Sequence, residues 1–159
     1  MRDYFARLLT FDDGATREVL RAIGANGEPD GSIRLLAHVV AAEWLWLRRL
    51  GRSGRPMAVW PELSAAEIAR ELAPLRQEWR GVLDEGEERL RGTISYSNSK
   101  GEPWTSGVGD VLTHVFAHGV HHRGQILSLF RAAGMTPPYV DFIEASRRGF
   151  LDAPAVRPV

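Results

Sequence analysis

The sequence predicts an all-α protein, a four-helix bundle with a long crossover connection before the fourth helix. Four segments carry apolar residues at helical spacing, turns rich in Gly and Pro separate them, and only the stretch 93–105 has a different period. The 159 residues suffice for one domain with a single core. We expect this domain to span residues 1–150 and to be followed by a loose tail, 151–159.

A short turn separates the first two helices. Apolar residues keep a helical period from about residue 2 to residue 24, and the turn at 27–31 interrupts it. The second helix, 33–52, is apolar on almost every side. A helix of that composition is either central in a bundle or covered by a second subunit. Residues 51–61 form a turn-rich connector to the third helix.

The remaining elements extend to residue 148. Ser64 and Glu67 form a capping-box pattern at the start of a third helix that reaches about residue 90, and Pro74 predicts a kink or a restart inside it. The change of period predicts a short hairpin or an ordered loop at 93–105. A long fourth helix follows at 107–133, and a last short helix is expected at 140–148.

Composition excludes several classes of function. Twenty basic and twenty acidic residues cancel, so there is no electrostatic reason to expect nucleic acid or an anionic membrane surface as a partner. No stretch is apolar for long enough to predict a membrane helix, and the charged start does not resemble a signal peptide, so we expect a cytoplasmic protein. The chain has no cysteine, which rules out thiolate metal ligands, disulfides and a cysteine nucleophile.

Four of the five histidines lie close together in the predicted fourth helix, at positions 114, 118, 121 and 122. Residues four apart on a helix lie one turn above each other, so His118 and His122 can hold one metal ion. A helical wheel points His122 into the apolar face and His118 to its edge, which favours this pair over His114 with His118. The fifth histidine, His38, lies in the second helix and would complete an open three-ligand site.

Alternatives remain for the histidines and their neighbours. We expect His114 and His121 to be solvated or interface side chains, or residues that orient a ligand. The simplest alternative is a metal-free bundle in which the histidines only pack against their neighbours. Imidazole ligands suit zinc or nickel, which we expect first, and also iron or copper. Glu43 faces away from His38 on the helical wheel, so no catalytic base is assigned.

The chain resembles the DinB/YfiT-like family of small metal-binding bundles over about residues 1–148. The resemblance rests on three segments: Leu36-Ala-His-Val-Val-Ala-Ala-Glu-Trp-Leu-Trp-Leu, His114-Val-Phe-Ala-His-Gly-Val-His-His-Arg-Gly-Gln and Pro137-Pro-Tyr-Val-Asp-Phe. It implies a divalent metal on His38, His118 and His122. It also implies transferase or isomerase activity with a small-molecule thiol such as mycothiol or bacillithiol, and a homodimer.

Two functions are compatible with such a site. In the first, the protein is a metal-dependent thiol transferase or isomerase, or a hydrolase-like metalloenzyme, in which the metal lowers the pKa of a substrate thiol. In the second, the metal only stabilises a structural or stress-response protein. The second function needs a closed site, for which Asp141 or Glu144 could supply a fourth ligand.

The second helix also predicts how the protein assembles. Val40 and Trp44 lie opposite His38 on the helical wheel, so they face outward if His38 faces the interior. Large apolar side chains of this kind are rarely left exposed. The connector could fold back over them through Met57, Val59 and Trp60. We expect instead a homodimer whose two-fold interface includes the second helix.

Overall fold

The protein is mostly helical, as predicted. The structure, a computed structural model, describes residues 1–151, so the expected tail lies outside the described residues except for Leu151, which is buried. Across the described part of the chain, no helix is both long and apolar enough to cross a membrane. The elements are α1 (Arg2–Asn26), α2 (Ser32–Arg49), α3 (Ala65–Asp84), α4 (Glu87–Arg91), β1 (Thr93–Ser97), β2 (Pro103–Gly107), α5 (Val108–Ala132) and α6 (Phe142–Arg147).

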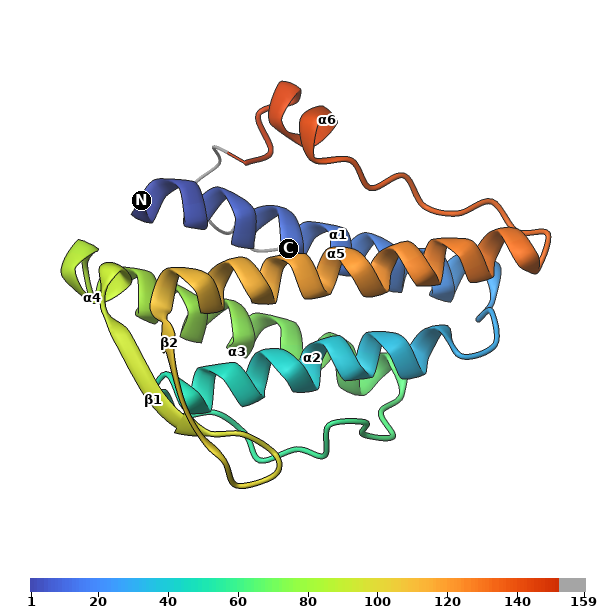
Figure 1. Cartoon of the computed structure of the whole chain (residues 1–159). Helices are drawn as coiled ribbons and strands as arrows, with labels where there is room; N and C mark the ends of the chain where they lie inside the picture. The colour runs from blue at the N-terminus through green and yellow to red at the C-terminus, as the bar shows by residue number, and fades with distance from the viewer. Residues whose placement is uncertain (152–159) are drawn as a thin grey trace.

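The four long helices lie side by side (Figure 1). Helices α3 and α5 each pack against both α1 and α2. Because α2 and α3 run in the same direction, the connector 50–64 returns along the length of the helices before α3 begins (Figure 1). We expected the crossover before the fourth long helix. The connection there is also long, but α4 and the β1–β2 hairpin fill it at one end of the molecule (Figure 1).

Local sequence signals set the ends of α3. The side chain of Ser64 accepts a hydrogen bond from the Glu67 backbone N–H, and the Glu67 carboxylate accepts one from the Ser64 N–H, which confirms the capping box. The helix continues through Pro74 without a restart. It ends instead before Gly86, whose φ of 95° is a left-handed conformation that glycine adopts without strain.

The two short predicted elements are both present. Strands β1 and β2 pair antiparallel from Thr93↔Gly107 to Ser97↔Pro103, so the hairpin extends two residues past the predicted 93–105. Helix α6 begins at Phe142 because the Asp141 carboxylate accepts a hydrogen bond from the Glu144 N–H at 2.8 Å.

The expectation that Val40 and Trp44 of α2 face outward is wrong. Val40 is 0% and Trp44 2% exposed, since α2 packs against both α3 and α5. The Trp44 indole N–H donates to Glu71 of α3 at 2.9 Å. The chain itself therefore covers these side chains, and the homodimer stays a prediction that rests on the family resemblance.

One buried ion pair joins α1 to α5. Asp12, a carboxylate among the buried residues of α1, pairs with Arg123. The Arg123 guanidinium also donates to the Thr16 hydroxyl at 3.0 Å. Gly119 makes room for this pair, because a Cβ there would lie 2.5 Å from a carboxylate oxygen of Asp12. The ion pair therefore helps to fix how α5 and its histidines sit against α1.

Candidate metal centre

Three histidines from two helices meet in one place, and they are the three predicted from the sequence. One ring nitrogen from each of His38, His118 and His122 lies within 4.8 Å of the other two. Nε2 of His38 and Nε2 of His118 are 3.1 Å apart. His38 of α2 is buried, whereas the two histidines of α5 are partly exposed, so the group lies where solvent reaches it.

The connector after α2 fixes the orientation of His38. Its Nδ1 lies 2.7 Å from the backbone oxygen of Val59. A carbonyl oxygen can only accept, so Nδ1 carries the proton and Nε2 presents its lone pair to the other two histidines. The Trp60 ring stacks on the imidazole with centroids 3.8 Å apart, and the Arg34 guanidinium lies 5.3 Å from the centroid of Trp60.

A neighbouring glutamine orients His122 in a similar way. Nδ1 of His122 lies 2.7 Å from Oε1 of Gln125, which is on the same helix three residues later. With that oxygen accepting, the proton is on Nδ1 and the Nε2 lone pair is free. Hydrogen bonds of this kind fix the tautomer and the ring position of histidine ligands.

We predict that Gln125→Leu weakens metal binding by about 10–100-fold, as the loss of such a supporting hydrogen bond does at other metal sites. Gln125→Glu keeps an acceptor oxygen and should retain affinity. Titration of metal-free protein with Zn²⁺ against a competing chelator measures both constants. Equal affinities in the two variants would show that the hydrogen bond does not support the site.

The surroundings of His118 and His122 favour the neutral form of both imidazoles. Burial, together with the nearby His122 and His38 rings, lowers the pKa of His118 to about 4. Burial also lowers the pKa of His122, against the opposing effect of Gln125. A neutral imidazole has the lone pair that a metal ion needs, so the lowered pKa values of His118 and His122 reduce competition between a proton and a metal ion at these two ligands.

The donor set fits a divalent metal ion. Two nitrogens that both lie about 2.0–2.1 Å from a tetrahedral zinc are about 3.3 Å apart, close to the 3.1 Å between His38 and His118. Three protein ligands are typical of metal sites that keep a position for water or substrate. The residues present therefore fit a metal site with an open position better than a closed four-ligand site.

The two carboxylates expected as possible fourth ligands make other contacts. Asp141 caps α6, and Glu144 forms an ion pair with Arg148 at 2.6 Å. Within residues 1–151, neither carboxylate belongs to a group that could hold a metal with the three histidines. His121 is exposed with its ring 5.0 Å from that of His122, as expected for a solvated neighbour.

An aromatic cluster extends from the histidines toward the hairpin. The His114 ring lies 5.7 Å from that of His118 and 5.3 Å from that of Trp46. Arg49 lies between Trp46 and Tyr96, with its guanidinium carbon 4.5 and 4.6 Å from the two ring centroids. Its Nε is buried without a hydrogen-bond partner in the described structure. The hairpin thus completes a surface of rings and one cation beside the candidate site.

Some of the residues that orient the ligands are not predictable from the sequence. The sequence suggests Val59 and Trp60 as a cover for Trp44, whereas they contact His38. No local pattern predicts this contact, because the connector folds back over 21 positions of the chain. Gln125 is within reach of sequence reasoning, since residues three apart on a helix are neighbours.

The fold and the site define a class of protein, a mostly helical one with three histidines placed to hold a metal ion. A family model described as the DinB family matches residues 13–148, which include all three histidines. The chain therefore belongs to the DinB family. A comparison with curated proteins gave no match.

Proposed function

We propose that this protein is a metal-dependent enzyme that acts on a small-molecule thiol, as a transferase or an isomerase. His38, His118 and His122 would hold the ion, for which zinc or nickel is the first choice by ligand type. The observation that carries the proposal is the convergence of three imidazoles, two with Nδ1 held by an acceptor, at a partly exposed position. DinB membership supports the metal site.

The chemistry that a divalent metal supplies at such a site is to lower the pKa of a thiol, so that it reacts as a thiolate. In a transfer reaction the thiolate sulfur forms a bond to an electrophilic carbon, the leaving group departs with its bonding electrons, and the thiol proton passes to solvent. Trp60 shields one face of His38 from water. The guanidinium of Arg49 offers a contact for an anionic group on the thiol.

A closed structural site has less support. The carboxylates considered as a fourth ligand, Asp141 and Glu144, instead cap α6 and pair with Arg148 at its end.

The cytoplasm suits the proposed substrate, because small thiols are kept reduced there. We therefore retain a cytoplasmic enzyme as the proposed function.

The test is His122→Ala, which removes one ligand. We expect purified untagged protein to change from about one metal ion per chain to none, and thiol transfer to a chromogenic electrophile to be lost with it. His121→Ala is the matched control, because it removes the adjacent exposed imidazole outside the group. Thiol transfer that persists in metal-free His122→Ala would contradict the proposal.

A further inference from the structure

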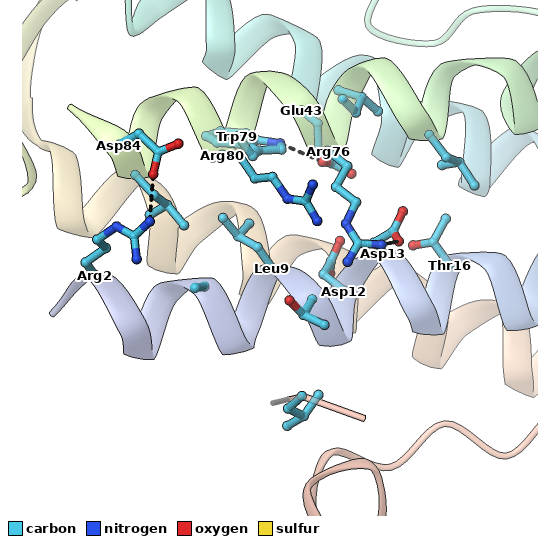
Figure 2. Close-up of a pocket in the computed structure, with 16 residues that line it drawn as sticks. Arg2, Leu9, Asp12, Asp13, Thr16, Glu43, Arg76, Trp79, Arg80 and Asp84 are labelled. Carbon is cyan, nitrogen blue, oxygen red and sulfur yellow. Dashed lines mark hydrogen bonds and ion pairs between the residues drawn. The ribbon is translucent and has the colours of Figure 1, made fainter. Parts of the chain in front are cut away.

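A cavity of about 340 Å³ lies between α1 and α3 (Figure 2). Its volume is within the range of about 300–1,000 Å³ that is common for small-molecule pockets. None of the three clustered histidines lines it. Glu43, which faces away from His38, forms part of its wall. The cavity is therefore a place distinct from the candidate metal centre.

Most charged groups around the cavity already have partners. Arg2 pairs with Asp84 at 2.6 Å and Arg76 pairs with Asp13 at 2.8 Å (Figure 2). The Asp12 carboxylate pairs with Arg123 of α5. The carboxylates of Asp84, Asp13 and Asp12 are thus all paired and not free to bind a ligand in the cavity. This argues against a cationic ligand.

Arg80 differs from the other arginines of the cavity. Its side chain extends from α3 into the space between the two helices (Figure 2). Nη2 is buried and has no hydrogen-bond partner within the described part of the chain. Burial and the neighbouring Arg76 lower the pKa of Arg80, an effect that Asp13 and Asp84 only partly oppose. A buried donor without an acceptor is costly, and an anion would satisfy it.

The rest of the lining specifies what the anion is attached to. Four leucines, one of α1 and three of α3, form an apolar wall: Leu9, Leu72, Leu75 and Leu83. Leu151, which follows α6, lines the cavity and is only 5% exposed. Such a wall favours a short hydrocarbon body and disfavours a free inorganic ion.

We propose that this cavity binds a small carboxylate with a short apolar chain, whose carboxylate accepts hydrogen bonds from Arg80. Glu43 assists, because burial and the nearby Asp12 raise its pKa to about 8, so that at pH 7 it is neutral and does not repel the anion. The polar cluster of Glu43 and Asp12 also connects the cavity to Arg123, the residue after His122. The site is thus next to the metal-binding helices without sharing a ligand.

Hexanoate is a suitable probe, and calorimetric titration at pH 7 measures its binding. We expect hexanoate to bind the wild-type protein, with 1-hexanol binding more weakly. Arg80→Gln should weaken hexanoate by about 10–100-fold, the cost of one charge-assisted hydrogen bond. Arg70→Gln, an exposed arginine of the same helix outside the cavity, and His122→Ala should bind as wild type does.

A second measurement needs no variant that alters the cavity. In NMR spectra the indole N–H of Trp79, which lines the cavity, should shift on adding hexanoate, and that of Trp60 beside His38 should not. The proposal is overturned if hexanoate fails to bind, if Arg80→Gln binds it as tightly as wild type, if 1-hexanol binds equally well, or if His122→Ala abolishes binding. A shift at Trp60 alone would overturn it too, by placing the anion at the metal centre.

Discussion

Arg123→Met should destabilise the protein by about 3–5 kcal/mol, which is the usual cost of removing one partner from a buried ion pair. Arg123 is 2% exposed and contacts both Asp12 and Thr16. Methionine fills much of the same space but leaves the Asp12 carboxylate in the interior without a cation. The expected loss is a large part of the about 5–15 kcal/mol by which such domains are stable. Urea unfolding followed by circular dichroism measures it.

A matched control and a compensating change make this result interpretable. Arg131→Met alters an exposed arginine on the same helix, and we expect a change within about 0.5 kcal/mol. Asp12→Leu combined with Arg123→Met removes both charges and should recover most of the stability. If Arg123→Met is as mild as Arg131→Met, the ion pair does not hold α1 and α5 together as we infer.

Glu43→Gln should make the protein more stable at pH 8 by a few kcal/mol and leave it nearly unchanged at pH 4. Glu43 is buried, and its carboxylate oxygen accepts from the Trp79 indole N–H at 2.8 Å. Burial, reinforced by Asp12, raises its pKa from 4.5 to about 8. Between these two values the folded protein keeps a proton that the unfolded chain releases. The free energy of unfolding therefore falls as pH rises, by at most about 1.4 kcal/mol per pH unit from this group.

The difference between wild type and Glu43→Gln isolates this effect. The histidines whose pKa values are lowered act in the opposite direction between about pH 4 and 6.5, and they are common to both proteins. Urea unfolding at intervals from pH 4 to pH 9 gives the two curves. Glu62→Gln, an exposed glutamate in the connector 50–64, controls for the loss of a surface carboxylate. A difference that does not grow with pH would show that Glu43 is ionised in the folded protein.

Much of the candidate site is predictable because it depends on residues that are close together in the sequence. A helix places residues four apart on one face whatever it packs against, so spacing together with the apolar face of the helix selects the pair His118 and His122. The capping box at Ser64 and the cap of α6 at Asp141 depend on three or four consecutive residues in the same way. The absence of cysteine restricts the possible ligands to imidazoles and carboxylates by composition alone.

The orientation of α2 cannot be predicted in the same way. Its sequence is apolar on most sides, and Leu35 and Leu45 accompany Arg34 and Arg48 on the side that meets solvent, so the pattern marks that side only weakly. An inward-pointing His38 implies that Val40 and Trp44 lie outside, but α3 and α5 bury both sides of the helix. Only the packing of other helices around α2 decides which of its residues meet solvent.

The helices, the caps of α3 and α6 and the histidine pair of α5 are encoded locally in the sequence, because each depends on contacts within a few residues. The contact of Val59 and Trp60 with His38 arises only from tertiary packing. So do the pairing of Asp12 with Arg123 across 111 positions and the cavity that holds Arg80. Contacts so distant in sequence form only when whole helix faces fit together, and that fit depends on side-chain shape and burial, which no local pattern contains.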